Sequence, residues 1–109
     1  MKIKKFLLIL IFPFLLNTLT SFADEAKMTK GLEIFNETAG CAACHVLKAA
    51  GSEGNIGPNL DTVEGLNYNS VMDIVTHGLG VMPAFGEDEI LTKEEIDIVS
   101  FYVANSVSK

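Results

Sequence analysis

The feature of this chain that most constrains its fold is the segment Cys41-Ala42-Ala43-Cys44-His45, which holds both of its cysteines. On a helical turn, residues three apart lie on one face, so the two thiols point the same way. An imidazole follows them at once. This pattern is the attachment signature of a c-type haem, because the two sulfurs reach the two vinyl groups of one porphyrin and the imidazole nitrogen ligates its iron.

Three other kinds of site use a pair of cysteines at this spacing: a disulfide, half of a zinc site and a thioredoxin-like redox pair. Zinc needs two further soft ligands, and the other candidate in the chain is His77. A redox pair needs a strand–helix–strand context that the sequence lacks. Covalently attached haem c, with its iron, is therefore the favoured interpretation.

Residues 1–23 have the pattern of a secretory signal peptide. A lysine-rich start precedes an apolar run over residues 6–16, and small residues stand at Ser21 and Ala23, where a peptidase would cut. An uncleaved membrane anchor would need about 20 apolar residues, and polar residues interrupt the run too soon. We therefore expect no permanent membrane anchor and an exported, periplasmic cytochrome-like domain of residues 24–109. Export also suits the chemistry, since the cysteines must meet haem outside the reducing cytosol.

The domain left after cleavage is small and strongly acidic. All 14 acidic residues lie in it, whereas the basic residues that remain, of 8 in the chain, are Lys27, Lys30, Lys48, Lys93 and Lys109. A chain this short buries only a modest apolar core and needs an additional source of stability, such as a covalently bound cofactor. The haem supplies it, so we expect the apoprotein to be poorly folded. The charge excludes nucleic acid as a partner. It favours redox protein partners with basic docking faces, although acidic residues also simply keep a protein soluble.

The apolar periodicity predicts three helices separated by glycine-rich loops, and nothing like a pair of strands. The first helix covers residues 26–38. The second covers residues 69–77, with Ser70 as its cap and Asp73 in a capping-box position. The third follows the capping box Thr92-Lys93-Glu94-Glu95 and presents an apolar face, which must pack on the first helix.

The segment over residues 48–66 is predicted to be a loop. Gly51, Gly54, Gly57 and Pro58 break any regular period in it. Glycine lets the backbone pass close to a flat ligand, and long loops in compact domains are usually functional. We therefore expect this loop to wrap the edge of the haem.

The second axial ligand decides whether the iron is closed or open to gases and peroxide, and the candidates are Met28, Met72, His77 and Met82. Met72 lies on an apolar helical face, where methionine is a common core residue, and Met28 is close to the new N-terminus. His77 ends the second helix, where a cation or a donor to free carbonyls is favourable, so we assign it to that end. Met82 stands in a loop that Pro83 keeps extended. A thioether there can face the iron and raise its potential, so we predict Met82 as the ligand.

The haem motif, Gly57-Pro58-Asn59-Leu60 and Met82-Pro83-Ala84-Phe85 together resemble the class I cytochromes c, especially the short bacterial monohaem forms. The resemblance implies an all-α fold of three main helices around one covalently bound haem. It implies that the Pro58 carbonyl accepts a hydrogen bond from the second ring nitrogen of His45. It also implies contacts between the first and last helices, through Gly31, Phe35, Val99 and Tyr102. The chain departs from the lysine-ringed members because it is acidic, so their partners cannot be carried over.

The predicted haem site thus consists of Cys41, Cys44, His45, Pro58 and Met82, with His45 and Met82 on the iron and no catalytic residue. We expect a soluble periplasmic carrier that passes one electron at a time between redox partners, as in a respiratory chain, and that is not an enzyme by itself. A second hypothesis is a small haem c subunit of a periplasmic dehydrogenase, for example one that oxidises a sulfur compound. A third is a haem sensor or peroxidase with an open distal site. Donor, acceptor and oligomeric state stay open.

Overall fold

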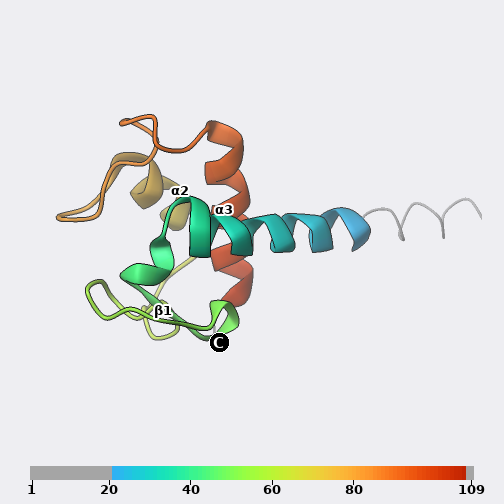
Figure 1. The fold of residues 1–109 in the computed structure, drawn as a ribbon, viewed down its shortest axis with the longest axis horizontal. Helices are drawn as coiled ribbons and strands as arrows, with labels where there is room; N and C mark the ends of the chain where they lie inside the picture. The colour runs from blue at the N-terminus through green and yellow to red at the C-terminus, as the bar shows by residue number, and fades with distance from the viewer. Residues whose placement is uncertain (1–20, 108–109) are drawn as a thin grey trace, which may run out of the picture.

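The structure, a computed structural model, describes residues 21–107 and shows helices that cross around one core, with loops on one side (Figure 1). The N-terminal helix covers residues 21–33 and continues as the π-helical turn η1 (Ile34–Thr38). The other long elements are α2 (Tyr68–His77) and α3 (Lys93–Ser106). The three predicted helices are therefore confirmed. Of the predicted signal peptide, residues 1–20 lie outside the described residues, and residues 21–23 are helical.

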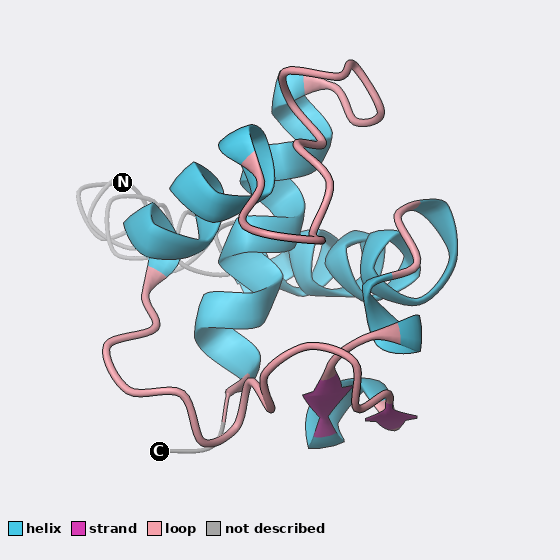
Figure 2. Cartoon of the chain, turned by 90° about the vertical axis from the view of Figure 1, so that its left-hand side faces the viewer, coloured by secondary structure: helices cyan, strands magenta, loops and turns pink. Residues whose placement is uncertain are grey.

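Short elements fill the segment after the N-terminal helix: η2 (Cys41–Ala43), β1 (Val46–Leu47), η3 (Lys48–Ala50) and β2 (Ser52–Glu53). The two strands pair antiparallel and lie at one edge of the helical body (Figure 2). The expectation that nothing in the chain resembles a strand pair, and with it a strictly all-α fold, is therefore wrong in this detail. Gly51 adopts a left-handed φ of 67° and turns the chain back. Strands of two residues are too short to leave a period in the sequence.

The core is built by all the long helices, by Leu47 of β1 and by the loop between α2 and α3. Its buried apolar side chains are Ile34, Phe35, Leu47, Val71, Val75, Phe85, Leu91, Ile96, Val99, Tyr102 and Val103. Among residues 21–107, no helix is long and apolar enough to cross a membrane.

The N-terminal helix packs directly on α3, as the resemblance implied. The rings of Phe35 and Tyr102 lie 6.0 Å apart between centroids. Gly31 is buried at the crossing, and a Cβ there would stand 2.2 Å from Cβ of Tyr102. Glycine at this position therefore lets the two helix backbones approach each other closely.

We expect Gly31→Ala to lower the thermal midpoint of the holoprotein by roughly 5–15 °C, because overpacking costs about 1–3 kcal/mol. Helix propensity alone would favour alanine by about 1 kcal/mol, but the atom that it meets is a Cβ rather than a flexible chain end. Lys30→Ala is the matched control, since it removes only an exposed pair with Glu33. Midpoints within a degree or two of each other for the two variants would contradict this packing.

The caps of α2 and α3 show where the sequence prediction succeeded and where it failed. Thr92 caps α3, and its capping box with Glu95 is present as predicted. For α2 the predicted cap, Ser70, is wrong: Asn67 is the N-cap, and Ser70 completes its capping box from the third helical position. Asparagine and serine are both good caps, so the pattern alone did not separate one register from the other.

Asp97 on α3 joins the three helices at the surface. It accepts a hydrogen bond from the Tyr68 hydroxyl of α2 and pairs with Lys27 of the N-terminal helix at 2.9 Å. These two partners, the tyrosine first, hold the pKa of Asp97 below its ordinary value. The network therefore fixes how α2 and the N-terminal helix lie on α3.

Candidate haem site

The cysteine motif forms a single 3₁₀ turn, η2. Gly40 precedes it with a left-handed φ of 70°, and the amides of Cys44 and His45 both donate to the Cys41 carbonyl, at 3.1 and 3.0 Å. Residues three apart eclipse one another on such a turn, so Cys41 and Cys44 present their sulfurs on one side. Both residues are half-buried and unpaired.

The structure argues against the other uses of this cysteine pair. Burial raises the pKa of the Cys41 thiol to about 11, whereas the attacking thiol of a redox pair has a lowered pKa. Within the part of the chain that the structure describes, no group of three or more His, Cys, Asp or Glu side chains could hold a metal ion. The zinc alternative therefore lacks its ligands there.

His45 is oriented by a single strong hydrogen bond. Its Nδ1 lies 2.7 Å from the carbonyl oxygen of Pro58, as the resemblance implied. A carbonyl only accepts, so Nδ1 carries the proton and Nε2 keeps a free lone pair. Nε2 makes no hydrogen bond within residues 21–107. This is the tautomer and the free nitrogen that an iron ligand needs.

The loop over residues 48–66 approaches the motif itself. A Cβ on Gly57 would stand 2.5 Å from Cε1 of His45, and the Gly57 amide donates to the Cys44 carbonyl at 2.7 Å. A Cβ on Gly54 would stand 2.5 Å from the Ala43 carbonyl oxygen. The loop is predicted to wrap the edge of the haem, and within the described residues the close neighbours of these two glycines are the motif's backbone and the His45 ring. Glycine at both positions lets the loop hold the imidazole in place.

Ser52 is a site residue that the sequence analysis missed. It is buried on β2, where its hydroxyl donates to the His45 carbonyl at 2.8 Å and accepts from the Leu47 amide at 3.0 Å. It therefore fixes the backbone that carries the imidazole. A serine in a predicted loop gives no signal of this role, because the role depends on a hairpin that the sequence did not reveal.

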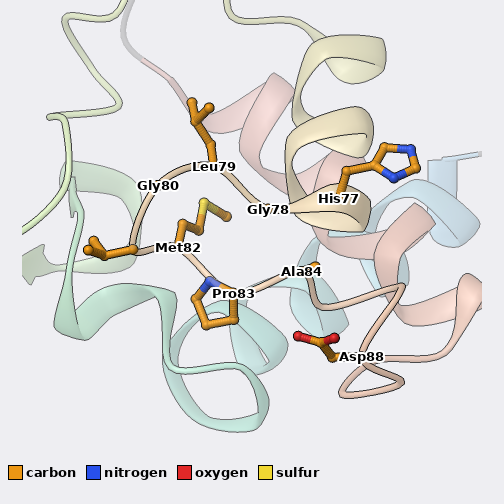
Figure 3. Close-up of a pocket in the computed structure, with 9 residues that line it drawn as sticks. His77, Gly78, Leu79, Gly80, Met82, Pro83, Ala84 and Asp88 are labelled. Atoms are coloured by element: carbon orange, nitrogen blue, oxygen red, sulfur yellow. The ribbon is translucent and has the colours of Figure 1, made fainter.

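Met82 lies in a tight turn of the loop between α2 and α3. The amides and carbonyls of Leu79 and Met82 bond to each other, at 3.2 and 3.0 Å, and Gly80 adopts a left-handed φ of 58°. Figure 3 shows the turn with its side chains. Met82 is half-buried and packs against the core, whereas Val81 is 91% exposed. The turn thus directs a thioether inward on a backbone held by hydrogen bonds.

Both ring nitrogens of His77 lie close to carboxylates. Its Nδ1 lies 2.5 Å from Glu87 and its Nε2 lies 3.6 Å from Asp73. His77 ends α2 in its last turn, as predicted, but its ring bonds Glu87 rather than the carbonyls there, one of which accepts from the Gly78 amide. The hydrogen bond to Glu87 raises the pKa of His77. With both ring nitrogens facing carboxylates, the His77 ring is less available to a metal than the Met82 thioether.

The raised pKa of His77 predicts a small pH dependence of stability. Protonation of His77 favours the folded state, so its contribution is complete below about pH 6.5 and is lost as the pH rises through the raised pKa. We expect the thermal midpoint of the wild type to fall over this window relative to that of His77→Gln, measured as a series of melts. Parallel curves for the two proteins would contradict the pairing with Glu87.

The residues present fit a covalently attached haem. Two thiols and an imidazole nitrogen without a partner stand on one short segment, and a thioether comes from a separate loop. Cys41 and Met82 both pack against the same apolar core, which suits a large apolar macrocycle. One imidazole and one thioether would give the donor set of a haem used for electron transfer.

Comparison with known proteins agrees with this chemistry. A family profile described as "cytochrome C oxidase, cbb3-type, subunit III" matches residues 26–103. The solved structure of the c-type cytochrome SorU from Sinorhizobium meliloti is 44% identical and covers 78% of this chain and 95% of its own, with a TM-score of 0.69. A search of curated proteins found no match. The chain therefore belongs to the cytochrome c family that this profile describes, and it is a short monohaem class I cytochrome c with one covalently bound haem c.

Proposed function

We propose that this electron-transfer protein is an exported, soluble one-electron carrier of the periplasm, with His45 and Met82 as the axial ligands of its haem. Cys41 and Cys44 form the two thioether bonds. The observation that supports this proposal best is the His45 geometry: the Pro58 carbonyl holds the proton on Nδ1 and leaves Nε2 free for iron. When bound, the haem supplies a one-electron iron couple.

The protein's own residues set the conditions for transfer. The Pro58 carbonyl polarises the His45 ring and raises its basicity as a ligand, and Gly57 and Ser52 restrict its movement. A thioether from Met82 would favour the reduced state of the iron and so would raise its potential. With His45 and Met82 both holding the iron, no position would remain for a substrate, and we propose that the chain is not an enzyme by itself.

The experiment that tests this assignment is expression in a host competent in cytochrome c maturation. We expect a coloured product whose haem stays with the polypeptide in denaturant and whose N-terminus is Asp24. The reduced protein should not bind carbon monoxide at neutral pH, because Met82 closes the distal side. Ready binding of carbon monoxide would contradict the proposal that Met82 closes the distal side of the iron, and it would favour the sensor or peroxidase alternative.

A second candidate function is a small haem subunit of a periplasmic dehydrogenase. The apolar side chains of Leu79 and Val81 are 69% and 91% exposed at the Met82 turn, where a permanent partner would cover them. Size measurement of the native periplasmic protein separates the two. A free monomer supports the mobile carrier, and a stable complex with a larger protein supports the subunit.

A further inference from the structure

The Pro58 carbonyl that accepts from the His45 ring belongs to residues 57–61, which are hydrogen-bonded to residues 44–48 on either side of this ring contact. Two backbone bonds join the segments: the Gly57 amide to the Cys44 carbonyl at 2.7 Å, and the Leu60 amide to the Val46 carbonyl at 3.0 Å. The length of the bond between the ring and Pro58 therefore depends on how one segment lies along the other.

Asp61 joins the two segments a third time, through its side chain. Its carboxylate accepts a hydrogen bond from the Lys48 amide at 2.9 Å. Lys48 is the first residue of η3, and the N-cap of that turn, Leu47, provides no side-chain cap of its own. The free amide at the start of η3 is therefore satisfied by a carboxylate 13 residues further along the chain. A charged acceptor makes this bond stronger than one between neutral groups.

Asp61 also belongs to a compact turn that begins one residue after Pro58. The Asp61 amide donates to the side-chain oxygen of Asn59 at 2.9 Å. The amides of Thr62 and Val63 both donate to the Asn59 carbonyl, each at 3.2 Å. These bonds make residues 59–63 one unit, so a shift of Asp61 away from Lys48 would carry the Pro58 peptide with it.

The backbone of His45 would not follow this shift, because a different residue holds it. The hydroxyl of buried Ser52 donates to the His45 carbonyl at 2.8 Å. We propose that Asp61 is a positioning residue for the axial imidazole: through the Lys48 amide, it sets the distance between the Pro58 carbonyl and Nδ1 of His45. The inference rests on the proposed function, in which His45 ligates the iron. A longer bond would make the imidazole a less basic ligand, which favours ferrous iron.

The test compares Asp61→Ala with Asp61→Asn in holoprotein that carries ¹⁵N-labelled histidine. Both variants lose the same charge, but asparagine keeps an oxygen that can accept from the Lys48 amide. In Asp61→Ala we expect the ring N–H of His45 to exchange with solvent about tenfold faster than in the wild type, and its resonance to move. The equilibrium constant for haem reduction by ferrocyanide should be about threefold higher in Asp61→Ala than in Asp61→Asn. The chain has two histidines, so the His77 resonances serve as the internal reference and should stay unchanged.

Glu64→Ala is the matched control, since Glu64 is exposed three residues after Asp61 and makes no hydrogen bond or ion pair within residues 21–107. It should match the wild type in ring exchange. Equal ring resonances and equal reduction constants in Asp61→Ala and Asp61→Asn would overturn the proposal, because charge or general stability would then explain any effect. So would a thermal midpoint that falls in Asp61→Ala while the ring resonance stays in place.

The wild type provides a measurement that does not depend on Asp61→Ala folding. Its Lys48 amide should exchange at least about tenfold more slowly than in an unstructured chain, and so should that of Asp61→Asn. Rapid exchange at Lys48 in the wild type would contradict the bond itself. Failure of the proposed function has a different signature: the His45 ring resonances of the wild type would then show no paramagnetic shift on oxidation of the iron, whatever residue stands at position 61.

Discussion

Met82→Ala is expected to lower the reduction potential by on the order of 0.1 V or more, a part of the roughly 0.8 V that axial ligands span. The thioether stabilises ferrous iron, and alanine cannot replace it. The variant should also bind carbon monoxide in the reduced state, since the vacated position becomes open. Redox titration and the absorption spectrum with and without carbon monoxide measure both effects.

Met72→Ala is the matched control for this experiment. Met72 is also a half-buried methionine packed against the core, but it lies on α2 rather than in the turn. Its loss should cost about 2–5 kcal/mol of stability and leave the ligand spectrum as it is. His77→Ala should likewise keep the spectrum, because its ring pairs with carboxylates. An open-site spectrum in His77→Ala, with Met82→Ala unchanged, would show that the ligand assignment is wrong.

Gly57→Ala is expected to displace the His45 ring, with an effect on the haem site as large as that of Met82→Ala. The added methyl would stand 2.5 Å from Cε1 and 2.9 Å from Nδ1 of the ring, so the imidazole must move away from the Pro58 carbonyl. Disturbing such a supporting bond weakens metal binding about 10–100-fold. We expect a lower yield of holoprotein, a lower thermal midpoint and a reduced form in which part of the iron has lost His45.

Asn55→Ala provides the comparison, because Asn55 is exposed in the same loop and makes no hydrogen bond that the structure shows. It should match the wild type in haem content and spectrum. If Gly57→Ala also behaved like the wild type, the close contact between the loop and the ring would not be what positions His45.

Sequence reasoning succeeded where function depends on residues that are close in the chain. The spacing of Cys41, Cys44 and His45 already predicts one helical turn with both sulfurs on the same side, and η2 has that geometry. The capping box of α3 is equally local. The packing of Gly31 against Tyr102 was reached only through the resemblance, because no local pattern relates residues so far apart.

The parts that sequence reasoning missed depend on contacts between distant segments. Ser52 supports His45 only because two short strands pair, and strands of two residues leave no periodic signal. His77 lies in the last turn of α2 as predicted, but its hydrogen bond to Glu87, ten residues further on, is a contact that its position in the helix does not indicate. Close approach of the 48–66 loop to the haem stays a prediction, whereas the contacts of Gly54 and Gly57 with the cysteine motif and the His45 ring are set by the folded loop and leave no local signal.

The hydrogen bond from His45 to Pro58 would also allow electron transfer at the iron without an accompanying proton transfer from the imidazole. An imidazole that bound iron through Nε2 would keep its hydrogen on Nδ1 against a carbonyl that cannot release one in return. Oxidation of the metal would then leave this hydrogen where it is. On this side of the porphyrin, charge could cross to a partner without waiting for acid–base chemistry or for water to rearrange.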